Sequence, residues 1–480
     1  MNKKTFFNVI WYSILYLFKI LFPLAILPIF TNHISIQDFG IYALAVFFGT
    51  FTSGIANLGL TSVFERNFFE YNPLERKILL WNILLFVLFL IFVLSSITLI
   101  FKSLIAKIIF LNSDLKDFLF LAFLLQSFKS LNLYFLTYLK NSENAKKFTY
   151  LSIIESSLSI GIAFILVVEL SMGLFGFILG QTLGVGLVFF GSFIYLFYPF
   201  HHKFDINQIK GQLRLSLPLT PRIFFGAINT QFDRYMLGLV GLIGGVGLFD
   251  IGQRIANTSF AFMTTLQNIY APEVYNRFFS SDIKYRKSIG GYLTPFFYVS
   301  IFFCLLIGIF SSEILILLTP KEFHDASSIV TILCLLYGFY FFGKQPQLLF
   351  AKKTGLISVL SFVTISLNIG LNYPMIKLFG VMGAVWATTA AGVISTSIYF
   401  YFGQKYALIN YEKIVFVLIG YFIVSLISVY LLSNYFPDLD SLMKIKILFV
   451  VGYFLIGVKA KILKKSSFEF FRYFSKVNEI

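Results

Sequence analysis

The chain has 480 residues, of which 58% are hydrophobic and 12% are charged, and its mean hydropathy is +0.84. These values exclude a soluble globular protein of this length, because its surface would have to be built from apolar side chains. The net charge of +16 is spread over many short loops and a basic tail, which argues against a nucleic-acid partner and is typical of an all-α polytopic membrane protein.

Apolar runs long enough to cross a bilayer recur along the whole chain. The first run follows a basic N-terminus, is too long for a signal-peptide core and lacks a small-residue cleavage site, so it predicts an uncleaved span. We expect fourteen transmembrane helices joined by connections too short to hold a separate catalytic domain. They lie near residues 8–31, 40–64, 78–101, 117–139, 149–169, 172–198, 215–240, 247–270, 291–318, 325–345, 356–376, 379–402, 413–433 and 442–461.

The distribution of basic residues predicts the orientation. Most of the 38 Lys and Arg residues fall in segments that share one side of the membrane if the N-terminus is cytoplasmic. Because basic loops stay inside, we expect both termini of this multi-pass membrane protein in the cytoplasm. The tail, 462–480, is basic with interspersed Phe and is expected to contact anionic lipid headgroups.

A faint internal repeat predicts the domain organisation. The segment 157–161 (SLSIG) is similar to 366–370 (SLNIG), and the small residues that follow match pairwise: Gly173, Gly176 and Gly180 with Gly380, Gly383 and Ala387. Chance similarity between apolar helices is the alternative explanation. Together with the charge pattern, the repeat favours two six-helix lobes at 1–200 and 201–403, followed by two additional helices at 404–461.

Polar residues form stripes on two neighbouring spans between Arg214 and Tyr275. Steps of three and four residues place them on one helix face. A charge at the centre of a membrane helix costs about 2.5 to 3.5 kcal/mol, so such residues face protein or water instead of lipid. The two stripes predict a shared, wet, partly cationic cavity, and the glycines between them predict a turn at 241–247. The stripes comprise Arg222, Gly226, Asn229 and Asp233, then Asp250, Arg254, Asn257, Ala261, Thr264 and Asn268.

Three stretches of the sequence resemble a known family. The segment beginning LPLTP at Leu217, with FDRYMLGLVG and VGLFDIGQRIAN, is similar to the start of the second lobe of bacterial oligosaccharide flippases, the O-antigen and capsule repeat-unit transporters of the multidrug/oligosaccharidyl-lipid/polysaccharide exporter superfamily. The first hairpin (PIFT…DFGIY) and the segment 368–391 agree with that family. One departure is Asn32, where the family often has a basic residue.

The resemblance implies a transporter instead of an enzyme, located in the inner or plasma membrane of a bacterium. Its substrate would be a polyprenyl-diphosphate-linked oligosaccharide, moved from the cytoplasmic to the outer leaflet for surface polysaccharide biosynthesis. The polysaccharide would be a capsule or the O-antigen of a lipopolysaccharide. Membrane lipids, and the polymerase or glycosyltransferases of the same pathway, would be its partners.

Cations and polar residues within the spans are the candidate substrate-binding groups, because a diphosphate requires concentrated positive charge. The cations are Arg222, Arg254, Lys19, Arg234 and Lys129, and the cavity polar residues are Asn229, Asp233, Asp250, Asn257 and Asn268. Local pairing, of Asp250 with Arg254 or of Asp233 with Arg234, is the alternative for part of this set. Glu155 is a candidate coupling carboxylate, or a hydrogen bonder near the cytoplasmic end of its helix.

Other mechanisms and functions fit the sequence less well. No GxxxxGK[ST] loop occurs and the four histidines have no metal-ligand spacing, so we expect neither ATP nor a metal or other cofactor. A cation-coupled multidrug exporter of the same superfamily would be expected to carry buried acids in the first lobe, where the first span has Lys19. A polyprenyl-dependent glycosyltransferase or polymerase would need a larger outer loop than the segment 102–116.

Overall fold

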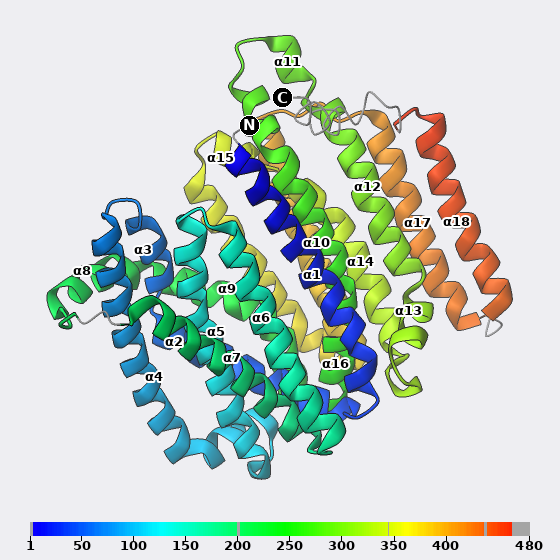
Figure 1. Cartoon of the computed structure of the whole chain (residues 1–480). Helices are drawn as coiled ribbons and strands as arrows, with labels where there is room; N and C mark the ends of the chain where they lie inside the picture. Colours follow the sequence, from blue (N-terminus) through cyan, green and yellow to red (C-terminus); the bar gives the residue numbers. More distant parts are fainter. Residues whose placement is uncertain (1–2, 199–201, 344, 436–438, 463–480) are drawn as a thin grey trace. The chain divides into compact units, whose positions relative to one another are not determined.

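Figure 1 shows the computed structural model of the protein, which describes residues 3–198, 202–343, 345–435 and 439–462. The basic tail predicted at the C-terminus lies outside these residues, apart from its first position. Helices make up 88% of the structure, and no strand occurs in the described residues. The chain divides into two compact units, residues 1–250 and 251–480, each of which is treated by itself. The lobe boundaries at residues 200 and 403 stay predictions.

In unit 1, α5 is the central helix and packs against α2, α4 and α7, while α6 packs against α1 and α7, and α9 packs on α2. The helices are α1 (Lys3–Thr31), α2 (Ile36–Asn57), α3 (Leu60–Asn67), α4 (Pro73–Phe110), α5 (Lys116–Asn141), α6 (Ala145–Phe164), α7 (Gly173–Phe197), α8 (Ile206–Ser216), α9 (Thr220–Leu239) and the first two turns of α10 (Ile243–Phe279).

Unit 2 contains the rest of α10 and a group of long helices, of which α12, α14 and α17 pack together and α18 packs on α12 and α17 (Figure 1). An ion pair joins α18 to α13, since Nζ of the buried Lys446 lies 2.7 and 2.8 Å from the two carboxylate oxygens of the partly exposed Glu313. The helices are α11 (Ile283–Lys287), α12 (Ile289–Ile309), α13 (Ser311–Leu318), α14 (Ala326–Gly343), α15 (Gln347–Phe350), α16 (Thr354–Tyr406), α17 (Lys413–Tyr435) and α18 (Leu439–Lys459).

Ten helices of the described part are long and apolar enough to cross a membrane, which agrees with a polytopic membrane protein. The helices α10 and α18 are not among the ten, and both carry several charged residues. Half of the side chains of α9 lie outside the described residues, so the number ten does not cover this helix in full. The helix α16 counts once, although its backbone breaks at Gly380 between the two spans predicted there. The number fourteen and the cytoplasmic position of both termini therefore stay predictions.

Two matching glycines of the sequence repeat have the same unusual backbone conformation. Gly173, at the start of α7, has a φ of +53°, and Gly380, at the break in α16, has a φ of +58°. Side chains with a Cβ rarely adopt this region, so glycine is needed at both corners. The geometry is consistent with a repeated helix–corner–helix element, once in each unit.

The turn between α9 and α10 is shorter than the sequence predicted. α9 ends at Leu239 and α10 begins at Ile243, so of the glycines assigned to a turn at 241–247 only Gly241, with a φ of +80°, lies in it. The others are helical. Gly247 allows a close contact instead, because a Cβ there would lie 2.1 Å from the backbone oxygen of Ile36 at the start of α2.

We expect Gly247→Ala to destabilise unit 1 by about 1–3 kcal/mol, because the added methyl group must push apart two helix backbones. Gly244→Ala is the matched control one turn earlier on α10, where the nearest atom to a Cβ lies at 3.9 Å. Thermal unfolding of the two purified variants in detergent would measure the difference. Equal melting temperatures would show that α10 does not pack this closely on α2.

Candidate functional site

A buried ion pair connects α9 and α10 within unit 1. Arg234 Nη2 lies 2.8 Å from Asp250 Oδ1, and both side chains are more than 90% buried. The other end of the guanidinium donates a hydrogen bond to Gln231 one turn earlier on α9. Asp233 is buried beside Arg234. The charge of Arg234 is thus already balanced by protein, so this arginine joins two helices in the structure.

Two lysines of unit 1 are in a different electrostatic situation. Lys19 on α1 is exposed and Lys129 on α5 is half-buried, and both belong to helices apolar enough to span a membrane. Among the described residues, neither ammonium group has a carboxylate within 4 Å. A lysine at this depth cannot face lipid without a large cost, so an exposed one must face water or an anionic ligand.

The carboxylate of Glu155 lies near both lysines. Its helix, α6, packs against α1 and α5. Glu155 interacts electrostatically with both lysines, more strongly with Lys129 than with Lys19. In the described part of the chain, Glu155 Oε2 is buried with no hydrogen-bond partner. Asn132 of α5 is a further neighbour that interacts with this carboxylate. The two roles that the sequence left open for Glu155, a coupling carboxylate or a hydrogen bonder, both stay predictions.

Two further buried oxygens on the same helices lack partners among the described residues: the Tyr16 hydroxyl of α1 and the Ser152 hydroxyl of α6. Tyr16 precedes Lys19 by one helical turn, as Ser152 precedes Glu155, so each helix presents a polar pair on one face. Buried polar groups are normally hydrogen-bonded. The unsatisfied oxygens therefore suit water or a polar ligand.

We call Lys19, Lys129 and Glu155 the lysine–glutamate cluster.

The polar stripe predicted on α10 continues into unit 2. Asn257 and Asn268 are exposed and Arg254 is half-buried. The Asn257 amide oxygen accepts a hydrogen bond of 2.6 Å from the hydroxyl of Tyr337 on α14. These exposed amides agree with a hydrated helix face, and Tyr337 is a residue that the sequence pattern did not single out.

The remaining candidates belong to α9. The backbone of this helix is described, but the side chains of Arg222 and Asn229 lie outside the described residues. Their predicted positions in the cavity stay predictions. The sequence analysis also missed the pairing of Arg234 with Asp250, because steps of three and four residues detect partners only within one helix.

Cysteine labelling tests the hydrated face of α10. In a variant without Cys304 and Cys334, both of which are buried, we expect Asn257→Cys to react with a small water-soluble thiol reagent. Ala256→Cys is the control on the neighbouring face, since Ala256 is 0% exposed. The rate at position 257 should exceed the rate at 256 at least about tenfold, because only ionised, accessible thiols react. Equal rates would mean that the polar face of α10 is assigned wrongly.

A comparison with models of protein families assigns the chain to one of them. A family model described as polysaccharide biosynthesis protein matches residues 6–267, more than half of the chain. The chain belongs to this family. The match includes every residue of the lysine–glutamate cluster and the Arg234–Asp250 pair. No curated protein matches the sequence.

Solved structures of membrane transporters share the fold of this family member. A structure described as lipid II flippase MurJ in an inward closed conformation is similar with a TM-score of 0.70 and 19% identity, covering 95% of this chain and 99% of the other. An inward-facing multidrug resistance MATE family transporter of the MOP superfamily has a TM-score of 0.57 at 16% identity, with 80% and 94% covered. A structure of the MATE multidrug transporter DinF-BH has a TM-score of 0.52 at 18% identity, with 82% and 94% covered.

Proposed function

We propose that the protein is a flippase that moves a polyprenyl-diphosphate-linked oligosaccharide from the cytoplasmic to the outer leaflet for surface polysaccharide biosynthesis. The observation that carries the proposal is the membership of the polysaccharide biosynthesis family. The MurJ structure, whose description names a lipid II flippase, has the same fold along nearly the whole chain. O-antigen or capsule repeat units are the substrates we propose, in the inner membrane of a bacterium.

The lysine–glutamate cluster supports an anionic substrate group. A diphosphate would be attracted by Lys19 and Lys129, which have no carboxylate within 4 Å in the described part of the chain, and lysine is a regular phosphate ligand. In the empty protein, Glu155 partly balances the two lysines. We propose that the diphosphate takes over this role when it binds, and that Glu155 is then free to hold a proton or another coupling ion.

Arg222 and Arg254 are the proposed second set of cations, on α9 and α10. Arg222 would meet the diphosphate where the second lobe begins at the cytoplasmic side, and the exposed Asn257 and Asn268 would face the sugars. The polyprenyl tail stays in lipid while the two lobes alternate between inward-open and outward-open states. Glycosyltransferases would supply the substrate on one side of the membrane and a polymerase or ligase would consume it on the other.

The shared fold alone does not separate a flippase from a multidrug exporter, because structures of both kinds are similar to this chain. The charges favour the flippase. A cationic drug would be repelled by Lys19 and Lys129, whereas a diphosphate would be attracted. An enzymatic role as a polymerase or glycosyltransferase is disfavoured by the family.

Deletion of the gene in its own host tests the proposal. We expect loss of the surface polysaccharide together with accumulation of the lipid-linked oligosaccharide in the cell membrane, because synthesis of the repeat unit continues while its transfer stops. Extracted lipids analysed by mass spectrometry would show the intermediate. Intact polysaccharide combined with increased sensitivity to cationic drugs would instead support the multidrug exporter.

A further inference from the structure

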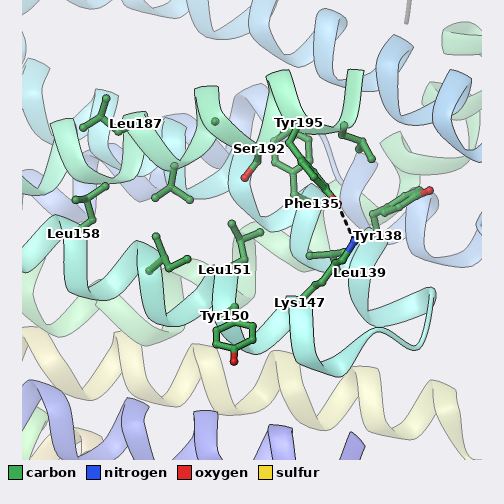
Figure 2. A pocket seen from close by; sticks show the side chains of 14 residues that line it. Phe135, Tyr138, Leu139, Lys147, Tyr150, Leu151, Leu158, Leu187, Ser192 and Tyr195 are labelled. Carbon is green, nitrogen blue, oxygen red and sulfur yellow. Dashed lines mark hydrogen bonds between the residues drawn. The ribbon is translucent and has the colours of Figure 1, made fainter. Parts of the chain in front are cut away.

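A groove in unit 1 is lined by none of the residues of the lysine–glutamate cluster. It is formed by α5, α6 and α7, has a volume of about 510 Å³ and is lined mainly by apolar side chains, with Leu151, Leu158 and Leu187 along its length (Figure 2). One end of the groove is polar, because Lys147 there donates a hydrogen bond to the hydroxyl of Tyr195. The groove thus combines an apolar channel with a cationic end.

The helix face beside the groove is suited to lipid. On α7 the side chains of Leu183, Leu187, Phe190 and Ile194 follow one another at helical spacing, and all are roughly half exposed or more. A face of this kind in a membrane helix carries no polar group that would require water or protein. We infer that the groove opens toward the bilayer.

Lys147 lines the polar end of the groove, whereas Lys146, the preceding residue of α6, lies beside Tyr150, which lines the groove. Neither lysine is neutralised by the described part of the protein. Lys147 Nζ lies 2.8 Å from the Tyr195 hydroxyl, and Lys146 Nζ lies 5.9 Å and 5.8 Å from the ring centroids of Trp11 and Tyr150. Among the described residues, neither lysine has a carboxylate within 4 Å. Lys140 provides a contrast a few residues earlier, because it forms a salt bridge with Glu65.

We propose that this groove binds an anionic phospholipid, with the phosphate at Lys147, next to Lys146, and one acyl chain along α6 and α7. The length of the groove favours a phospholipid over the polyprenyl tail of a substrate. Lys147 and Leu158 are about 17 Å apart along the α6 axis at roughly 1.5 Å per residue, which is close to half of a hydrocarbon core of about 30 Å. One acyl chain of a single leaflet fits this depth, whereas a long polyprenyl chain would extend beyond it. The position of these lysines in a segment predicted to be cytoplasmic assigns the lipid to that leaflet.

Tryptophan fluorescence can read this site directly, because the Trp11 ring lies 5.2 Å from that of Tyr150, which lines the groove. In a variant with Trp81→Phe and Trp386→Phe, Trp11 is the single tryptophan. The protein is reconstituted in vesicles whose phosphatidylglycerol or phosphatidylcholine has brominated chains, since bromine quenches a neighbouring tryptophan. We expect the apparent affinity of phosphatidylglycerol, measured by quenching of Trp11, to exceed that of phosphatidylcholine at least about tenfold. Each lysine near an anionic headgroup contributes roughly fivefold in affinity.

Three variants separate the charge from the groove. Lys146→Gln with Lys147→Gln should reduce the preference for phosphatidylglycerol to near onefold, while Lys140→Gln should keep it. Gly191→Leu should weaken quenching by both lipids. Gly191 lines the groove, and a Cβ added there has no other atom within 4 Å, so the leucine side chain has room to fill part of the groove.

Equal quenching by the two lipids in the single-tryptophan protein would overturn the proposal. So would displacement of phosphatidylglycerol by a lower concentration of polyprenyl phosphate, which would make the groove a substrate site. Native mass spectrometry of the unaltered chain provides a second reading, in which retained phosphatidylglycerol should be lost in the Lys146→Gln/Lys147→Gln variant. A dimer that excludes lipid from Trp11 would show that a second copy covers the groove, and would also overturn the proposal.

Discussion

Replacing Lys19 and Lys129 together by Gln is expected to reduce export of the surface polysaccharide by about a hundredfold or more. Each charge-assisted hydrogen bond to a phosphate is worth about 1.5–3 kcal/mol, or roughly tenfold or more in binding. The protein should still reach the membrane in normal amounts, because the removal of a charge from a membrane helix lowers its insertion cost. Quantification of surface polysaccharide against membrane-inserted protein would measure the effect.

Two matched variants test whether charge is the cause. Lys19→Arg with Lys129→Arg keeps both positive charges and should retain a large part of the export. Lys107→Gln removes an exposed lysine from the last turn of α4 and should leave export unchanged. Wild-type export by the protein without Lys19 and Lys129 would show that the diphosphate binds elsewhere.

Arg234→Ala is expected to cause the largest loss of folded protein among the single substitutions considered. It leaves the buried carboxylate of Asp250 without its arginine, and breaking a buried pair in this way costs about 3–5 kcal/mol. Yield of monodisperse protein and thermal unfolding in detergent would report the loss. Asp250→Ala should also be damaging, because it removes the carboxylate that pairs with the buried guanidinium.

The double variant Arg234→Met with Asp250→Leu should recover most of the stability, because apolar residues of similar volume replace both charges. Recovery of polysaccharide export by the double variant would assign the pair a structural role. If Arg234→Ala is instead fully folded but inactive, Arg234 contacts the substrate, and the role given to the ion pair is wrong.

The sequence predicted the all-helical, polytopic membrane class, because runs of apolar residues are sufficient to define it, whereas the number of spans stays a prediction. It predicted the turn at 241–247 incorrectly, since glycine is common both in turns and where two helices touch. Gly247 lies where two helices touch, and this contact is recognisable only from the position of Ile36 on α2.

The candidate site was predictable as a set of residue types but not as a set of neighbours. Lys19, Lys129 and Glu155 belong to three helices far apart in sequence, and no spacing rule predicts that Glu155 interacts with both lysines. Likewise, spacing along one helix offered only Arg254 as a partner of Asp250, and it did not predict that Arg234 of α9 lies 2.8 Å from the Asp250 carboxylate. Contacts between helices depend on packing, which a periodic pattern within one helix does not contain.

The most direct test of the proposed function is a flipping measurement with purified components. Vesicles would contain the protein and a polyprenyl-diphosphate-linked oligosaccharide that carries a fluorescent group on its sugar, and a membrane-impermeant reagent would destroy the fluorescence of the outer leaflet. With wild-type protein we predict that the reagent destroys nearly all of the fluorescence, whereas about half should survive in protein-free vesicles and with the variant that lacks Lys19 and Lys129. Survival of the same half with folded wild-type protein, under an imposed proton or sodium gradient and membrane potential, would contradict the account.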